Sequence, residues 1–269
     1  MTPVRVQQGG SPIILGQPHG GTFVPADILT RLNDRGRELT DTDWHINRLY
    51  DSLLADITVV QATFHRYVID ANRDPAGGSL YPGQNTTGLC PATDFDGLPL
   101  WEQPPDSDEI ERRRQQYHAP YHVALTAEVA RVKAQHGVAV VFDCHSIRSE
   151  IPFLFSGQLP LFNVGTNDGA TCDDAVANAV FAPCFAAADT VLNGRFKGGW
   201  TTRHYGVPAW NVHAIQMEIA QRGYLESESA PWVYDPRKAG TVRATLSICL
   251  NAVDRLARSG KFSQGAHHA

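Results

Sequence analysis

The sequence predicts an α/β domain, because short apolar runs alternate along the chain with segments of helical period. The run from Val138 to Phe142 is continuous and β-branched, which is typical of a central strand buried on both faces. Alternating strands and helices pack in layers around a sheet, so a layered domain follows. No break in composition divides the 269 residues, and we expect a single domain over 1–269 with a disordered tail at about 260–269.

The individual elements are predicted from hydrophobic period and from turn residues. Strands are expected at 13–15, 58–61, 66–70, 138–142, 152–155, 162–164 and 212–219. Helices are expected at 42–57, 107–136, 173–188 and 237–258, with Pro120 kinking or dividing the second of them. The segment from Asp74 to Pro105 is rich in Gly, Pro, Asn and Asp, and a loop this long predicts a wall of a functional site. The segment 193–206 is expected to be a basic loop.

Composition narrows the class of partner. The formal charge of -5 and the lack of basic runs argue against nucleic acid and favour a small solute. No stretch approaches the roughly 20 apolar residues needed to span a bilayer, so no membrane partner is expected. Five cysteines without CxxC spacing indicate a reducing compartment, and we expect a cytoplasmic location. The oligomeric state is left open.

Two histidines lie where apolar runs end, His19 in SPIILGQPHGG and His145 in GVAVVFDCHS. The carboxyl ends of strands open into a crevice in α/β sheets, so both imidazoles can reach one place. Two histidines and one carboxylate would form a three-ligand site with an open fourth position, as in catalytic zinc sites. The carboxylate is Asp43, expected in the first turn of a helix, or Asp143, which is placed to orient an imidazole instead.

Further polar residues suggest an acid/base group and an acidic ligand. Glu218 lies late in the apolar strand VHAIQMEIA, where a buried carboxylate is costly unless it is paired with another group or stands at the strand end. In a catalytic role it could accept a proton from water. Guanidinium groups bind carboxylates in fork geometry, so several of them near one crevice predict a dicarboxylate substrate. The candidate arginines are Arg73, Arg148, Arg195 and Arg203.

The sequence offers two other arrangements of reactive side chains. Cys144 could act as a nucleophile with His145 as base, although adjacent residues on a strand point to opposite faces. His118 and His122 have i, i+4 spacing, which can bind a metal on one helix face, but Pro120 between them disturbs the geometry.

The chain closely resembles the N-formylglutamate deformylase (amidohydrolase) family from about Pro12 to Tyr224. The resemblance is carried by the strings PHGGTFVP, LTDTDWHINRLYD, RYVIDANR, SLYPGQNTTGLCP, DCHSIRS, NGRFKGGWTTRHYG and AIQMEIAQRGY. It implies a three-layer αβα fold like that of the zinc carboxypeptidases, with a central mixed sheet covered by helices on both faces. It also implies a zinc-dependent hydrolase that converts N-formyl-L-glutamate and water to L-glutamate and formate, the last step of one histidine-degradation route.

The resemblance also implies roles for individual residues. His19, Asp43 and His145 fall on the positions of ligands for one Zn²⁺ per chain, with other divalent metals as alternatives, and Glu218 falls on the acid/base. A donor such as His204 or an arginine would stabilise the oxyanion, and Asn72 would fix the orientation of a substrate whose carboxylates the four arginines hold. Asn47 departs from the family pattern, where Asp is expected. A related zinc amidohydrolase acting on another N-acyl amino acid or a cell-wall peptide, and a non-catalytic dicarboxylate-binding protein, are the alternatives.

Overall fold

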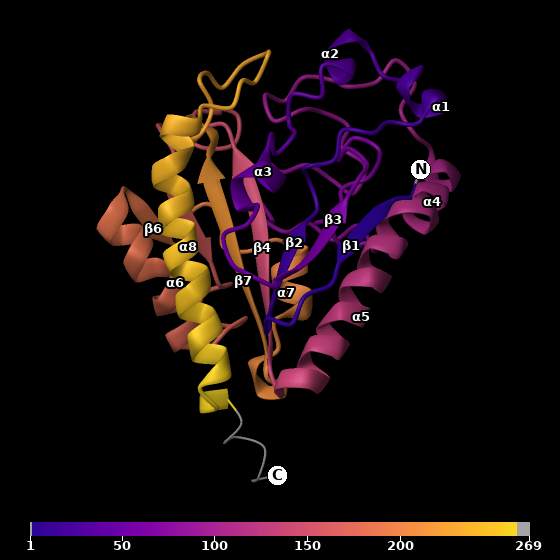
Figure 1. The fold of residues 1–269 in the computed structure, drawn as a ribbon. Coiled ribbons are helices and arrows are strands. Elements are labelled where there is room, and N and C mark those ends of the chain that lie inside the picture. The colour runs from indigo at the N-terminus through magenta and orange to yellow at the C-terminus, as the bar shows by residue number, and fades with distance from the viewer. Residues whose placement is uncertain (1, 263–269) are drawn as a thin grey trace.

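The computed structural model, which describes residues 2–262, has a seven-stranded mixed sheet in the order β1-β3-β2-β4-β7-β5-β6 (Figure 1). The strands are β1 (Val4–Gln7), β2 (Ile13–Gln17), β3 (Thr58–Ala62), β4 (Ala139–Ile147), β5 (Phe162–Gly165), β6 (Thr190–Leu192) and β7 (Val212–Ala220). β1 pairs antiparallel with β3, and β5 pairs antiparallel with β7, whereas the other neighbours are parallel. The predicted central mixed sheet is therefore confirmed.

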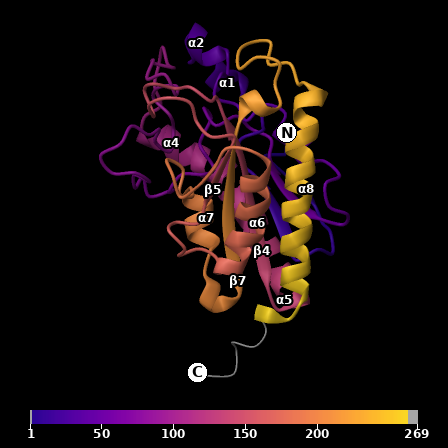
Figure 2. The same ribbon diagram turned by 90° about the vertical axis from the view of Figure 1, so that its left-hand side faces the viewer.

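Helices cover both faces of this sheet. The α-helices are α1 (Ala26–Leu29), α2 (Asp34–Arg37), α3 (Ile46–Tyr50), α4 (Ser107–Arg113), α5 (Ala119–His136), α6 (Asp174–Ala187), α7 (Trp200–Tyr205) and α8 (Pro236–Arg258). A π-helical turn, η1 (Arg114–His118), joins α4 to α5, and the 3₁₀ turns are η2 (Pro208–Trp210) and η3 (Gln221–Gly223). Side chains of α3, α6 and α8 share one core cluster with one face of the sheet, and those of α5 and α7 share a second cluster with the other face. Figure 2 shows α8 and α7 on opposite sides of the sheet.

Three parallel strands at the centre place one edge of the sheet beneath a set of loops. β2, β4 and β7 are neighbours, with Leu15 opposite Phe142 and His145 opposite Glu218. The loops that follow their carboxyl ends gather at the upper end of the molecule in Figure 1. After β2 the chain turns closely over its neighbour, because a Cβ on Gly21 would overlap the backbone of Thr63. The crevice expected at the strand ends therefore lies at this end of the sheet.

Some predicted elements are wrong. Residues 66–70 and 152–155 form no strand. The first closes a turn in which Val68 N donates to His65 O, and the second forms a helical turn onto the carbonyl of Ile151. The helix predicted over 42–57 shrinks to α3, because left-handed residues such as Ser52 end the helical period early. The segment 193–206 contains α7, and the short edge strands β1 and β6 were not predicted.

The chain end is partly included in the structure. Phe262 is buried in the first core cluster and its ring packs 4.4 Å from that of His213, so the start of the predicted tail is ordered. The remainder of that tail, 263–269, lies outside the described residues. Between residues 2 and 262 we find no helix with the length and apolar character needed to cross a membrane.

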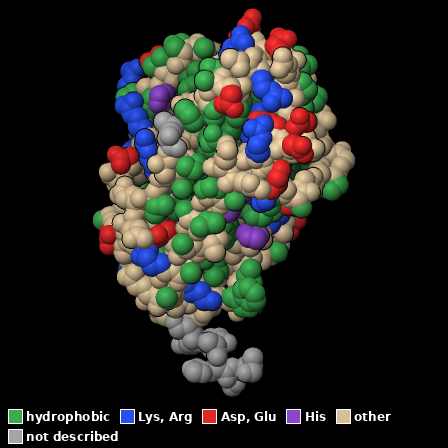
Figure 3. Space-filling model, turned by 90° about the vertical axis from the view of Figure 1, so that its right-hand side faces the viewer, with side chains coloured by type: hydrophobic (Ala, Val, Ile, Leu, Met, Phe, Trp, Pro, Cys, Tyr) green, Lys and Arg blue, Asp and Glu red, His purple; other side chains and the backbone are tan. Residues whose placement is uncertain are grey.

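The surface shown in Figure 3 carries acidic and basic side chains interspersed, with hydrophobic side chains in a band between them. This face does not show one continuous area of a single charge.

Candidate active site

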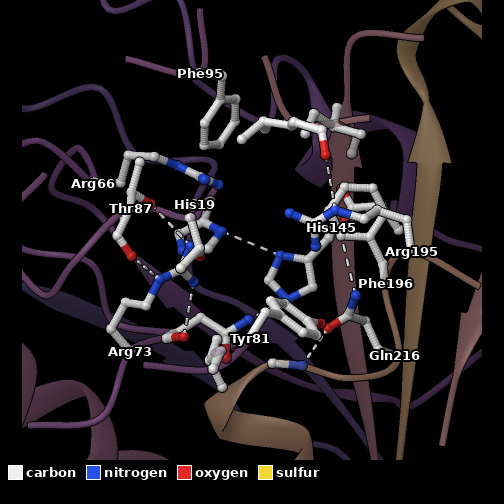
Figure 4. Close-up of a pocket in the computed structure, with 18 residues that line it drawn as sticks. His19, Arg66, Arg73, Tyr81, Thr87, Phe95, His145, Arg195, Phe196 and Gln216 are labelled. Atoms are coloured by element: carbon white, nitrogen blue, oxygen red, sulfur yellow. Dashed lines mark hydrogen bonds between the residues drawn. The ribbon is translucent and has the colours of Figure 1, made fainter. Parts of the chain in front are cut away.

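Three buried side chains converge beside the central strands: His19, Asp43 and His145. Nδ1 of His19 lies 3.2 Å from Nδ1 of His145. Oδ2 of Asp43 lies 3.9 Å from the first of these nitrogens and 3.4 Å from the second. Figure 4 shows the two imidazoles facing each other across the pocket. The structure thus brings together the three residues predicted as ligands.

The chain delivers these three residues from separate elements. His19 follows β2 by two residues, and its carbonyl accepts a hydrogen bond from Asp43 N (3.1 Å), which ties the turn before α3 to the end of β2. Asp43 precedes α3 and is not in a helical first turn, because His45 takes a left-handed conformation with φ 57°. His145 lies within β4 and not after its end, since that strand continues to Ile147.

The donor set fits a divalent metal. Two ligands bound tetrahedrally at zinc distances of about 2.0–2.1 Å lie about 3.3 Å apart, close to the separations of these three atoms. Three buried aspartates gather here, Asp43, Asp70 and Asp143, and they outnumber the guanidinium groups that contact them. Buried charge of one sign requires compensation, which a divalent cation would supply. His19, Asp43 and His145 therefore form a group able to hold a metal ion.

Carboxylates behind the imidazoles fix their orientation. Nε2 of His19 donates to Oδ1 of Asp70 at 2.6 Å, and Nε2 of His145 lies 3.1 Å from Oδ1 of Asp143. Both rings therefore point Nδ1 toward Asp43. In metal sites, a carboxylate beside one ring nitrogen of a histidine commonly orients the other nitrogen toward the metal in this way. Asp43, and not Asp143, belongs to the group able to hold a metal ion, whereas Asp143 lies beside Nε2 of His145. Asp70 was missed, although it ends the apolar run RYVID as His19 and His145 end theirs.

Glu218 lies beside this group. The parallel ladder places it directly opposite His145, and its side chain lines the pocket. Burial, helped by the neighbouring Asp43 and Asp143 carboxylates, raises the pKa of Glu218 to about 8, against the opposing effect of His145 and Arg66. Burial alone would raise the pKa of Asp43, but Arg66, with Nη2 2.8 Å from Oδ1, holds it below its usual value. Two carboxyl groups in one pocket thus have pKa values shifted in opposite directions, which is typical of acid/base sites.

Three arginines line the pocket: Arg66, Arg73 and Arg195. Arg66 and Arg73 lie on one side of the histidines in Figure 4 and Arg195 on the other. Arg195 donates from Nε to Leu154 O (3.1 Å) and from Nη2 to Asn85 O (2.7 Å), while its buried Nη1 has no partner among residues 2–262. Arg66 was not predicted as a site residue, because its segment was interpreted as a strand.

Asp43 belongs to the group able to hold a metal ion but does not line the pocket, and three other predicted site residues also lie outside the lining. Arg148 pairs with Asp96 at 3.0 Å, away from the cavity. Arg203 donates to the carbonyls of Gly198 and Leu80 and braces the loop around them. His204 is on the exposed side of α7, stacked 4.2 Å from the Trp200 ring. All three residues are close in sequence to residues of the site, but their side chains point elsewhere. The direction of each side chain depends on which side of its turn or helix faces the cavity, and the sequence does not show this.

Two side-chain amides connect the site to the N-terminal end of α7. Asn72 Oδ1 accepts from Thr201 N (2.8 Å), and Asn72 Nδ2 lies 3.1 Å from His145 Nε2. Gln216 Oε1 accepts from Gly199 N (2.6 Å), which turns its Nε2 toward Oε2 of Glu218 at 3.4 Å. Gln216 was missed, although it is two residues before Glu218 in a strand and so shares its face.

Cys144 points away from the site. Its side chain belongs to the core cluster beneath α3, α6 and α8, and burial raises the pKa of the thiol well above its usual value. A buried neutral thiol on the opposite face from His145 is poorly suited to act as a nucleophile.

Known proteins match this chain over most of its length. A sequence model described as N-formylglutamate amidohydrolase matches residues 11–225. The chain belongs to this family. Two curated relatives, both called N-formylglutamate deformylase, come from Pseudomonas aeruginosa and Pseudomonas putida. Each is 44% identical over 252 residues, which cover 92% of this chain and 94% of the first relative, and 91% and 93% for the second.

Solved structures agree with the N-formylglutamate amidohydrolase assignment. The N-formylglutamate amidohydrolase from Ralstonia eutropha JMP134 superposes with a TM-score of 0.81 at 25% identity, covering 97% of this chain and all (100%) of the other. A gene product from Agrobacterium tumefaciens superposes with a TM-score of 0.73 at 17% identity, covering 95% and 96%, and shows the shared fold. The family identified from the sequence strings is confirmed, and the site described above lies within the matched residues.

The orienting carboxylate of Asp70 provides a test of the metal site. We expect Asp70→Asn to weaken Zn²⁺ binding by about 10–100-fold, because the His19 imidazole loses its charged partner. The measurement is competition between apo-protein and a chromophoric zinc chelator. Asp168→Asn is the matched control, since Asp168 is exposed and pairs with Lys197 on the surface. Equal affinities of the two variants would show that Asp70 does not support a metal ligand.

Proposed function

We propose that the protein is a zinc-dependent hydrolase that converts N-formyl-L-glutamate and water to L-glutamate and formate. The observation that carries this proposal is the buried group of His19, Asp43 and His145 with Glu218 beside it, in a pocket lined by three arginines. The Pseudomonas relatives bear the name N-formylglutamate deformylase, which supports this substrate. All five cysteines are free thiols, which supports our expectation of a reducing, cytoplasmic location.

The residues divide the chemistry between them. Zn²⁺ held by His19, Asp43 and His145 would act as a Lewis acid and would lower the pKa of a bound water toward about 7. Glu218 accepts a proton from the attacking water and returns it to the nitrogen as the bond to the formyl carbon breaks. A cation nearby would lower the Glu218 pKa from about 8 and favour the ionised base. Glutamate leaves as the amine, and the oxygen of water is retained in formate.

Arg66 is our choice for the donor that stabilises the negative oxygen of the tetrahedral intermediate. It is buried in the pocket, and its Nη2 donates to Asp43 while its Nε has no partner within the described chain. A fixed guanidinium in a site of low dielectric requires no rearrangement as charge develops. Arg66 therefore replaces His204, whose exposed position on α7 lies away from the pocket lining.

Arg73 and Arg195 are our choices for binding the two carboxylates of the substrate. Arg73 is anchored by Nε and Nη2 to Thr87, and Arg195 is anchored by two backbone carbonyls. Anchored guanidinium groups lose little entropy when they bind a carboxylate. Apolar side chains, including Leu80, Leu154 and Phe196, line the same pocket and would contact the methylene groups of glutamate.

The direct test is release of formate from purified protein. We expect turnover of N-formylglutamate, slower turnover of N-formylaspartate, and little turnover of N-acetylglutamate, because the acetyl group needs more room at the metal. Removal of metal with a chelator abolishes activity, and added Zn²⁺ restores it. Alkylation of thiols serves as the control and leaves activity intact. Saturable binding of N-formylglutamate without formate release would instead identify a dicarboxylate-binding protein.

Replacement of the acid/base isolates its contribution. Glu218→Gln keeps the shape but cannot take a proton, so we expect kcat to fall by about 10²–10⁴-fold with Zn²⁺ stoichiometry unchanged. The matched control is Glu226→Gln, because Glu226 follows the same strand but is exposed. Formate assays and metal analysis of both variants check this prediction. A Glu218→Gln enzyme with near-normal kcat would remove Glu218 from this role.

Replacement of Arg195 tests the binding of a substrate carboxylate. Loss of a hydrogen bond to a charged group costs about 1.5–3 kcal/mol, so Arg195→Leu should raise KM for N-formylglutamate by about 10-fold or more. Arg203→Leu is a close control, because Arg203 also donates to two backbone carbonyls but does not line the pocket. Steady-state kinetics of both variants decide the matter, and equal KM values would contradict the assignment.

A further inference from the structure

Two histidines on the long helical segment contact the backbone of the turn Asp70–Arg73. Nε2 of His118 lies 3.0 Å from the carbonyl oxygen of Arg73, and Nε2 of His122 lies 2.8 Å from that of Ala71. A carbonyl oxygen can only accept, so each imidazole donates and carries its proton on Nε2. The two carbonyls flank Asn72 on either side, and the pair therefore holds the turn at two points.

The same turn contacts both histidines of the metal-binding group. Asp70 Oδ1 accepts from His19 Nε2 at 2.6 Å and from Asn72 N at 2.8 Å. Asn72 Nδ2 lies 3.1 Å from His145 Nε2. The side chains of Asn72 and Arg73 also line the pocket. A shift of this turn would move the orienting carboxylate, the amide and the arginine together.

The helix presents the two imidazoles side by side. Pro120 lies between them and has no N–H to donate to the carbonyl four residues earlier. His118 is the last residue of the π-helical turn η1, and His122 lies in the first turns of α5. The two ring centroids are 4.5 Å apart. Nδ1 of His122 lies 3.0 Å from the hydroxyl of Tyr205, which fixes the ring from the far side. Burial, with a smaller contribution from His118, lowers the pKa of His122 to about 3, so this ring stays neutral and Nδ1 can accept.

We propose that His118 and His122 are a positioning pair for the turn Asp70–Arg73, and that substrate binding and metal affinity both depend on it. The part that concerns substrate rests on the proposed function. Neither histidine lines the pocket that contains Glu218, and neither belongs to the group of His19, Asp43 and His145. The pair therefore acts through the backbone of the turn. A metal-binding role for these two histidines, considered from their spacing, is set aside because both Nε2 atoms are committed to carbonyl groups.

The test compares variants that keep or remove the two donors. The Gln side chain places an amide N–H near the position of Nε2, so the double variant His118→Gln, His122→Gln retains both donors, whereas His118→Leu, His122→Leu removes them. We expect the Leu variant to lose at least about 10-fold in kcat/KM for N-formylglutamate, with a raised KM, since small misplacements of substrate-positioning groups are costly. We expect it to bind Zn²⁺ about 10-fold more weakly. The Gln variant should recover most of both losses.

A second helix variant separates positioning from general destabilisation. Leu125→Ala removes a fully buried side chain from the same helix and leaves both imidazole donors in place. We expect it to lower thermal stability while kcat, KM and Zn²⁺ affinity stay within about twofold of the wild type when assayed well below its unfolding temperature. If the Leu double variant behaves as Leu125→Ala does, or if Gln restores nothing, the proposal fails.

Two measurements test the proposal even if a double variant fails to fold or the substrate is not N-formylglutamate. Nitrogen-15 NMR of the wild-type imidazoles needs no variant to fold, and both rings should be Nε2–H tautomers, whereas Nδ1–H tautomers would overturn the proposal. The Zn²⁺ titration does not depend on substrate. If the wild type releases no formate from N-formylglutamate, the proposed function fails, and the titration of the Leu and Gln variants still decides the role of the pair.

Discussion

The site depends first on the parallel pairing of β4 with its two neighbours. Because β4 and β7 pair in parallel, His145 lies directly opposite Glu218, and because β2 runs parallel on the other side of β4, the chain leaves β2 beside the same strand end. A shift of one residue in either pairing would turn the side chains of one strand to the opposite face. The buried apolar side chains on both faces of the sheet hold that register. The hydrophobic core therefore determines which polar side chains meet at the site.

Buried charge is the second constraint. Asp43, Asp70 and Asp143 are buried and would be costly as isolated carboxylates, yet each contacts an imidazole or a guanidinium group. Arg73 and His19 overcome the effect of burial and hold the pKa of Asp70 well below its usual range. Glu218 lacks so close a partner, and its pKa rises to about 8. Neighbouring carboxyl groups of one site thus have pKa values shifted in opposite directions, downward for Asp70 and upward for Glu218.

The turn Asp70–Arg73 joins the group able to hold a metal ion to the pocket beside it. Asp70 accepts a hydrogen bond from His19, Asn72 Nδ2 lies 3.1 Å from His145 Nε2, and Arg73 lines the cavity. The imidazoles of His118, in η1, and His122, in α5, contact two backbone carbonyl groups of the turn. α7 completes the surroundings, since a Cβ at Gly199 would overlap the side-chain amide of Asn72. Preorganisation of this kind requires support from several elements, and here the support comes from residues more than forty positions apart along the chain.

The sequence by itself determined the layered α/β class, the central strand near Val138–Phe142, and the family, because apolar period and long local strings are properties of neighbouring residues. It also identified His19, Asp43, His145 and Glu218 as residues to examine, since polar groups at the ends of buried strands are costly without a purpose. Tertiary structure decided the rest. Asp43 rather than Asp143 belongs to the group able to hold a metal ion, Arg66 lines the cavity whereas Arg148 does not, and α7 forms where a loop was predicted. These outcomes depend on partners distant in sequence, such as the side-chain amides of Asn72 and Gln216, which accept hydrogen bonds at the start of α7. The pattern of neighbouring residues does not reveal such contacts.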